Sequence, residues 1–151
     1  MSITPPSLTY PPSFGVEATN ADDVILGAVR SVYGWRFDSD DDPRAAVNRT
    51  QPLLSAALAT SLAAIPPEPF VNFKLWDEWK RAGARTYVRA TISPERHPAD
   101  TPYQQHRKAT TMISVTDRSG DALHQWEFAV LVVVQRQAGQ WLVAQFQPLG
   151  L

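Results

Sequence analysis

The sequence predicts an α+β domain in which N-terminal helices pack on a strongly curved, mainly antiparallel sheet of about four strands. The strongest observation is the run Trp126–Val134, where apolar and polar residues alternate with the period of a strand before both faces become apolar. A short loop containing Gly139 joins it to Trp141–Phe146, so the two runs should form an antiparallel hairpin. The first half of the chain instead repeats its apolar residues at helical spacing. Helices and strands that are segregated in this way are typical of an α+β domain.

Three or four helices are expected before the sheet. Thr19 or Asn20 can cap the first, and Asp22 and Asp23 lie in its first turn, where the helix dipole favours negative charge. Its single apolar stripe is predicted to lie across the concave face of the sheet. The predicted helices are Ala21–Tyr33, Pro43–Arg49, Pro52–Ala64 and Leu75–Ala82. The apolar face of the third is expected to consist of Leu54, Ala57, Leu58, Ser61 and Leu62.

Strand patterns fill the rest of the chain. The predicted strands are Ala84–Ile92, Tyr103–Asp117, His124–Gln135 and Trp141–Gln147. Gly83 ends the last helix, and a polar turn at 118–121 separates the second strand from the third. A strongly twisted sheet wrapped around a long first helix makes a cone with a mouth at one end. The tryptophans predicted for its core are Trp76, Trp79, Trp126 and Trp141.

Composition excludes several classes of function. A chain of 151 residues with 44% apolar residues fits one domain with a substantial core. The absence of cysteine excludes disulfides, thiolate catalysis and cysteine-ligated zinc. The net charge of −1 gives no general attraction to nucleic acid or to an anionic membrane, so nucleic acid is not expected as a partner. No stretch reaches the roughly 18 apolar residues of a membrane-spanning helix.

The sequence divides into a Pro-rich segment, residues 1–18, which is predicted to be flexible, and a single α+β cone domain, residues 19–151. The Pro-rich segment is interpreted either as a stalk between a membrane anchor and the domain or as an ordinary frayed terminus. It lacks the basic start and the apolar core of a signal peptide. The domain is therefore expected at the extracytoplasmic face of a bacterial membrane if an anchor was removed, and in the cytoplasm otherwise.

The order of these elements, over about residues 20–148, resembles the nuclear transport factor 2-like superfamily, also called cystatin-like cones. Within it, the chain resembles most the conjugation-channel scaffold proteins of type IV secretion systems, including the TcpC-like proteins of Gram-positive bacteria. The features that carry this resemblance are the exit from Trp79 through Gly83 into a strand, the long hairpin and the turn at Gly139–Trp141. It implies a domain held outside the membrane by one N-terminal helix. Anchored actinobacterial proteins associated with lipid uptake or secretion have a similar layout.

An enzyme of that superfamily would place an acid–base pair inside the cone. His124 is the leading candidate because it shares a strand face with Trp126 and Phe128, and its pKa could be shifted into the working range of a general base. Asp38 is its candidate carboxylate partner. The favoured interpretation of His124, however, is a histidine at a strand end that is half-solvated or hydrogen-bonded to a neighbour. The other acid–base candidates are His106, Asp40, Asp77 and Glu127, of which His106 is expected to lie on a solvated strand face beside Lys108 and Thr110.

No metal site and no cofactor are expected. The histidines lack ligand spacing, and the acidic run 38–42 lacks the central glycine and the terminal glutamate of an EF-hand, which favours an exposed acidic turn. The sequence also has no phosphate-binding glycine loop and no nucleophile elbow. Arg85, Arg89 and Arg107 could align across adjacent strands as a basic stripe, although a solvated face beside acidic partners is the alternative.

An apolar strip on the second face of the closing strand is the candidate interface. Ala129, Leu131 and Val133 lie there, and Tyr87 and Arg89 are placed at the edge of the strip on a neighbouring strand. The leading hypothesis is a non-catalytic scaffold or assembly domain of a membrane-associated secretion or conjugative DNA-transfer machine. Its partners would be other subunits of the machine or a second copy of the chain. The alternative is a small enzyme or small-molecule-binding protein, of isomerase, dehydratase or cyclase type, with a pocket in the cone.

Overall fold

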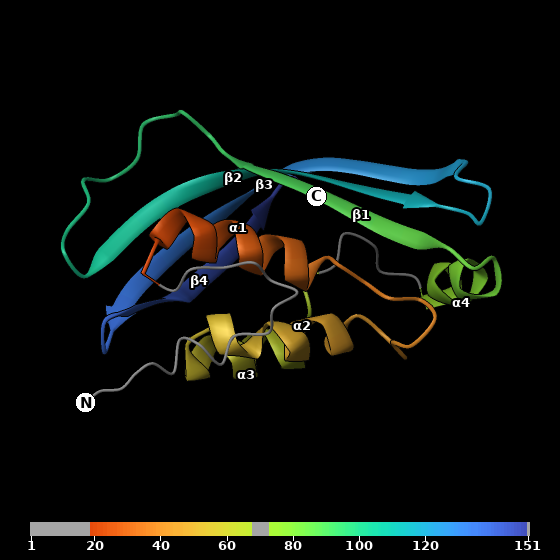
Figure 1. Ribbon diagram of the computed structural model, residues 1–151, viewed down its shortest axis with the longest axis horizontal. Helices are drawn as coiled ribbons and strands as arrows, with labels where there is room; N and C mark the ends of the chain where they lie inside the picture. Colours follow the sequence, from red (N-terminus) through yellow and green to blue (C-terminus); the bar gives the residue numbers. More distant parts are fainter. Residues whose placement is uncertain (1–18, 68–72, 151) are drawn as a thin grey trace.

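The computed structural model describes residues 19–67 and 73–150 (Figure 1). Four α-helices precede one four-stranded antiparallel sheet with the strand order β1-β2-β3-β4. The helices are α1 (Ala21–Val32), α2 (Arg44–Thr50), α3 (Ala56–Ala64) and α4 (Phe73–Arg81), and the 3-10 turn η3 (Gln51–Leu53) precedes α3. The strands are β1 (Arg85–Ile92), β2 (Gln104–Thr116), β3 (Ala122–Gln137) and β4 (Gln140–Leu149). The prediction of an α+β domain with helices before a curved antiparallel sheet is confirmed. The Pro-rich segment lies outside the described residues.

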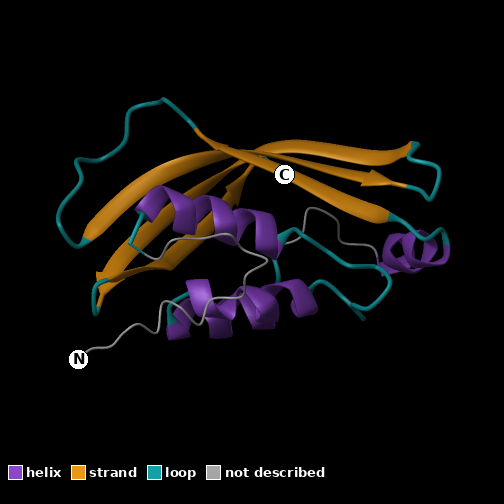
Figure 2. Cartoon of the chain, viewed as in Figure 1, coloured by secondary structure: helices purple, strands orange, loops and turns teal. Residues whose placement is uncertain are grey.

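Helix α1 lies in the hollow of the curved sheet, as Figure 2 shows, with α2 and α3 beyond it and α4 at one end of the molecule. Its amino end is capped by Asn20, whose side chain accepts a hydrogen bond of 3.1 Å from the backbone N–H of Asp23. The side of α1 that faces the sheet is apolar and buried. The predicted capping and position of this helix therefore match the structure.

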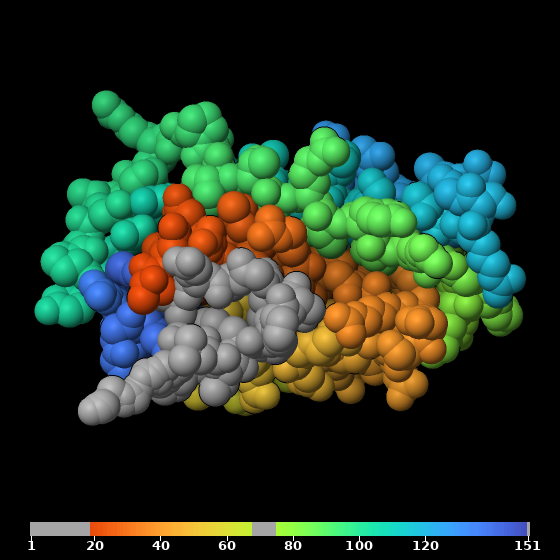
Figure 3. Space-filling view, in the orientation of Figure 1, coloured from red at the N-terminus to blue at the C-terminus, as the bar shows by residue number. Residues whose placement is uncertain are grey.

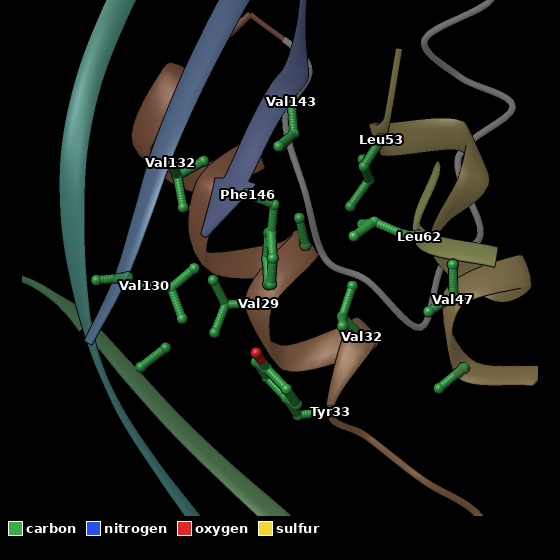
Figure 4. Close-up of a cluster of buried hydrophobic side chains, with 14 of the residues drawn as sticks. Val29, Val32, Tyr33, Val47, Leu53, Leu62, Val130, Val132, Val143 and Phe146 are labelled. Atoms are coloured by element: carbon green, nitrogen blue, oxygen red, sulfur yellow. The ribbon is translucent and has the colours of Figure 1, made fainter. Parts of the chain in front are cut away.

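The core fills the space between the sheet and the helices (Figure 4). Val130 and Val132 of β3 point from the sheet toward Val29 of α1, and Phe146 of β4 lies beside them. Leu53 and Leu62 come from the opposite side, from η3 and α3. The concave side of the sheet is thus occupied by side chains of the chain itself.

The third helix begins later than the sequence predicts. Leu54 is extended and forms a parallel bridge with Val143 of β4, and the N–H of Ser55 donates to the carbonyl of Val143 over 2.8 Å. The side chain of Ser55 then caps α3 by accepting from the N–H of Leu58. The start predicted at Pro52 is wrong because Leu54 pairs with the edge of β4, so the buried face of α3 is Ala59 and Leu62 while Ala57 is exposed.

An aromatic cluster attaches α4 to the rest of the domain. Phe37, in the loop after α1, lies with its ring centroid 4.7 Å from that of Trp76 and 5.9 Å from that of Trp79. Trp79 also lies 5.8 Å from Trp126 of β3, measured between ring centroids. Trp35 contacts Phe37, Trp76 and Trp126 at 6.1 to 6.3 Å. The predicted core tryptophans are buried or partly buried, and the loop after α1 contributes two aromatic core residues that the periodicity does not reveal.

The acidic run 38–42 is not simply an exposed turn. Asp40 is only 4% exposed, and its carboxylate accepts hydrogen bonds of 2.6 and 2.9 Å from the guanidinium of Arg49 in α2. The backbone N–H of Arg36 donates to the same carboxylate over 2.8 Å. The prediction of an exposed turn is therefore wrong for Asp40, because a helix that follows the run brings a cation back to it.

Candidate functional site

The outer, convex face of the sheet carries the predicted interface strip. Ala129, Leu131 and Val133 of β3 all lie on it, but their exposure differs: Leu131 is 38% exposed, whereas Val133 is 6% exposed. Tyr87 and Arg89 lie on the same face in β1, which pairs with β2 and not with β3. Strand β2 therefore lies between the strip and these two residues. The prediction that Tyr87 and Arg89 lie on a strand next to the strip is wrong.

A groove of about 500 Å³ is hollowed in this face above β2, β3 and β4. Leu131 and Val133 contribute apolar surface to it, and Leu58 of α3 adds to its lining. Its polar lining includes His106 and Lys108 of β2 and Arg96 of the loop between β1 and β2. The groove therefore combines apolar surface with basic side chains at its margin.

Ion pairs hold the loop between β1 and β2 beside the groove; Figure 3 shows this loop projecting at the upper left. Lys108 donates to both carboxylate oxygens of Glu95 over 3.0 and 3.1 Å. At the far end of the loop, the guanidinium of Arg107 donates to both oxygens of Asp100 over 2.7 Å. Arg107 also lies 3.4 Å from a carboxylate oxygen of Asp22 in α1. Because Arg107 points to the concave side, it does not align with Arg85 and Arg89 on the outer face. The three arginines therefore form no basic stripe, and Arg107 has the acidic partners Asp100 and Asp22.

His106 lies in the lining of this groove and is half-buried. Its Nδ1 is buried and has no hydrogen-bond partner among the described residues. The sequence places His106 on the outer strand face correctly but predicts a solvated position. The difference arises because the loop between β1 and β2 folds back beside β2, and no periodicity in the strand itself signals this.

The same ion pairs shift the ionisation of the loop carboxylates. The hydrogen bonds from Arg107 hold the pKa of Asp100 below its usual value, and in return Asp100 raises the pKa of the Arg107 guanidinium. The hydrogen bond from Lys108, with a second from Ser93, lowers the pKa of Glu95. Both carboxylates are therefore charged at neutral pH, which keeps the loop in place beside the groove.

Acid should weaken the ion pairs that hold this loop, among them the pair between Asp100 and Arg107. A carboxyl group whose pKa is lowered by folding stabilises the fold above its unfolded-state pKa, about 3.9, and that contribution is lost as the pH falls through the lower, folded-state value. We expect NMR titration of the Asp100 carboxyl to give a midpoint below about 3.9. In Arg107→Gln the midpoint should return toward that value, and an unchanged midpoint would show that Arg107 does not hold the carboxylate in solution.

The two catalytic candidates, His124 and Asp38, are both exposed. His124 is exposed, and its ring lies 4.3 Å from Trp126 and 6.4 Å from Trp79, measured between centroids. Asp38 is exposed in the loop after α1, where it lines a different cavity with Arg36. No hydrogen bond joins His124 to Asp38 within the described residues. His124 is thus placed on the face that the sequence predicts, against aromatic rings.

Within residues 19–67 and 73–150, no group of three or more His, Asp or Glu side chains is arranged to hold a metal ion. In the same part of the chain, no helix has both the length and the apolar character to cross a membrane. Comparisons of the chain with protein-family models, with curated proteins and with solved structures gave no match.

Proposed function

We propose that this chain is a non-catalytic assembly domain with a cone of the nuclear transport factor 2-like kind. It would bind another subunit of a membrane-associated secretion or conjugation machine, of the type IV kind, through the outer face of β3. The observation that carries this proposal is Leu131, a large apolar side chain that is 38% exposed in the lining of the outer groove. An apolar side chain in a concave, partly polar surface is typical of an interface anchor.

The occupied concave side supports an assembly role over catalysis inside the cone. Val130 and Val132 of β3 pack against α1 there, and Tyr33 lies edge-to-face with Phe128 at 5.2 Å between ring centroids. An enzyme of the alternative kind needs a cavity with converging polar groups on this side. The side chains described there are instead mainly aliphatic and aromatic.

The groove also indicates the chemistry of the partner. Arg96 and Lys108 outnumber the single carboxylate of Glu95 in its lining, and Lys108 is already paired with Glu95. A partner segment that places an apolar side chain on Leu131 and a carboxylate near Arg96 would match both features. Burial contributes roughly 25 cal/mol per Å² before the costs of association, so one small patch gives weak binding in dilute solution. Assembly in a larger machine would supply the effective concentration that the isolated domain lacks.

The substitution Leu131→Asp should weaken assembly while the domain stays folded, because Leu131 is partly exposed. Val133→Asp is the matched control on the same face: Val133 is 6% exposed, so a buried carboxylate should destabilise the domain itself. Thermal melting of both variants should show a near-native midpoint for Leu131→Asp and a large decrease for Val133→Asp. Sedimentation of mixtures with purified subunits from the same gene cluster, and of the chain alone at rising concentration, measures assembly.

Two results would contradict the proposal. If Leu131→Asp unfolds as Val133→Asp does, Leu131 is a core residue and the interface argument is lost. If the folded variant assembles with the same affinity as the wild type, the partner does not use this face.

A further inference from the structure

We propose that a second cavity, at the α4 end of the molecule, binds a small polyanion that carries at least two phosphate or carboxylate groups. The cavity has a volume of about 840 Å³, in the range of small-molecule sites. The loop after α1, the last turn of α4, the start of β1 and the turn between β2 and β3 line it. Figure 1 shows these four segments together at the right-hand end of the view.

Positive charge converges on this cavity from all four segments. Arg36, Lys80, Arg85 and Arg118 line it, and Asp38 is the acidic residue among the lining residues. The four cations therefore outnumber the one carboxylate in the lining. Like charges that share a cavity repel one another, and a bound anion removes that repulsion.

Three of these cations have no acidic partner within the described residues. The ion pairs there use Arg49, Arg107, Lys108 and His97, and none uses Arg36, Arg85 or Arg118. Lys80 is directed inward, since its ammonium group donates to the backbone carbonyl of Asp40 over 3.1 Å. The carboxylate of Asp40 is already held by Arg49, so it does not neutralise the cavity. The guanidinium groups are thus available to an anion, for which their paired N–H donors are suited.

Gly83 positions one of the arginines. It ends α4 with a φ of +64°, a conformation that favours glycine, and a Cβ added there would lie 2.3 Å from Nε of Arg118. The side chain of Arg118 therefore lies directly over the Gly83 backbone, which brings a residue of the β2–β3 turn against the start of β1. A side chain at position 83 would displace the guanidinium without removing its charge.

A polar atom and an aromatic ring complete the lining. Thr86 lines the cavity, and its Oγ1 is buried without a hydrogen-bond partner among the described residues, so a rotation about χ1 would give it one in a bound anion. Tyr87 also lines the cavity and is 57% exposed. The cavity is larger than one phosphate group requires, which indicates an organic anion with a body that packs beside the ring.

The test is calorimetric titration of the chain with tripolyphosphate, citrate and orthophosphate at about 0.15 M salt, with NMR mapping of the amides that shift. We expect tripolyphosphate or citrate to bind and orthophosphate to bind much more weakly; the order of the first two distinguishes a phosphorylated ligand from a polycarboxylate. The double variant Arg85→Gln/Arg118→Gln should lose at least about tenfold in affinity, since two charge-assisted hydrogen-bonding groups are removed. Gly83→Ala should weaken binding with the charge unchanged.

The matched control is Arg136→Gln/Arg96→Gln. Both control residues are exposed, like Arg85 and Arg118. Arg136 lies at the opposite end of β3 from the β2–β3 turn, and Arg96 follows the opposite end of β1 from Arg85. This variant should change affinity less than about twofold, because distant exposed charges are screened by salt. An equal loss in the control, amide shifts away from the cavity, or no binding of either polyanion would overturn the proposal. Thermal melting confirms that each variant is folded.

Discussion

Replacing Arg49 with methionine is expected to lower the free energy of unfolding by about 3 kcal/mol, the lower end of the range for breaking a buried ion pair. The guanidinium donates to both oxygens of Asp40, over 2.6 and 2.9 Å, and to the carbonyl of Gly34 over 3.0 Å. Methionine keeps the apolar stem but leaves the carboxylate, 4% exposed, without its cation. The side chain of Arg49 is itself 27% exposed, so solvent screens part of the pair. Equilibrium unfolding in urea measures the loss.

Arg44→Met is the matched control for this prediction. Arg44 lies in the same helix, is exposed, and forms no ion pair within the described residues, so its replacement should change stability by less than about 0.5 kcal/mol. Adding Asp40→Asn to Arg49→Met should recover part of the loss, because the buried charge is then removed as well. Equal stability of the two single variants would show that the Asp40–Arg49 pair does not hold the loop after α1 in solution.

The sheet and α1 are the parts of the fold that the sequence predicts well. The closing hairpin is signalled by an alternating run that becomes apolar on both faces, followed by the Ala138–Gly139 turn and a second apolar run. Both turn residues have positive φ, as the twist of a two-residue hairpin requires. Helix α1 is signalled by a capping residue and an apolar stripe of the right period. Both signals come from residues close together in the sequence, and the packing of the core favours the same secondary structure as these local signals.

Features that depend on long-range contacts were not predictable. Leu54 has the neighbours of a helical residue, but the edge of β4 draws it into a bridge with Val143. Phe37 lies in a polar loop without periodicity, so nothing in its surroundings marks it as a core residue. The polyanion cavity joins Arg36 to Arg118, which lie far apart in the sequence, through turns whose geometry a strand pattern does not contain. The surface sites are therefore formed largely by residues in loops and at the ends of helices and strands, whose positions depend on tertiary contacts.

Replacing Phe37 with alanine is expected to destabilise the domain by about 3 to 5 kcal/mol, the range for removing a buried aromatic ring. Phe37 is 1% exposed, and its ring lies within 6.3 Å of Trp35, Trp76 and Trp79, measured between centroids. Alanine leaves a cavity among large, rigid rings that cannot collapse easily to fill it. Urea unfolding measures the change, and Phe37→Leu should lose less because it fills more of the space. A loss below about 1 kcal/mol in the alanine variant would contradict the packing described here.

The substitution Phe37→Ala should also affect the cavity at the α4 end of the molecule. Trp76 and Trp79 attach α4 to the domain through Phe37. Helix α4 carries Lys80 and is followed by Gly83, over which Arg118 lies. Loosening α4 should therefore weaken polyanion binding in Phe37→Ala under conditions where the variant is still folded. Binding through the β3 face should not change, because Leu131 lies on the opposite side of the sheet from this cluster. Polyanion binding and partner binding should therefore both be measured in Phe37→Ala. A loss of polyanion binding alone would show that the cavity depends on the aromatic cluster, whereas a global loss of structure would reduce both activities together.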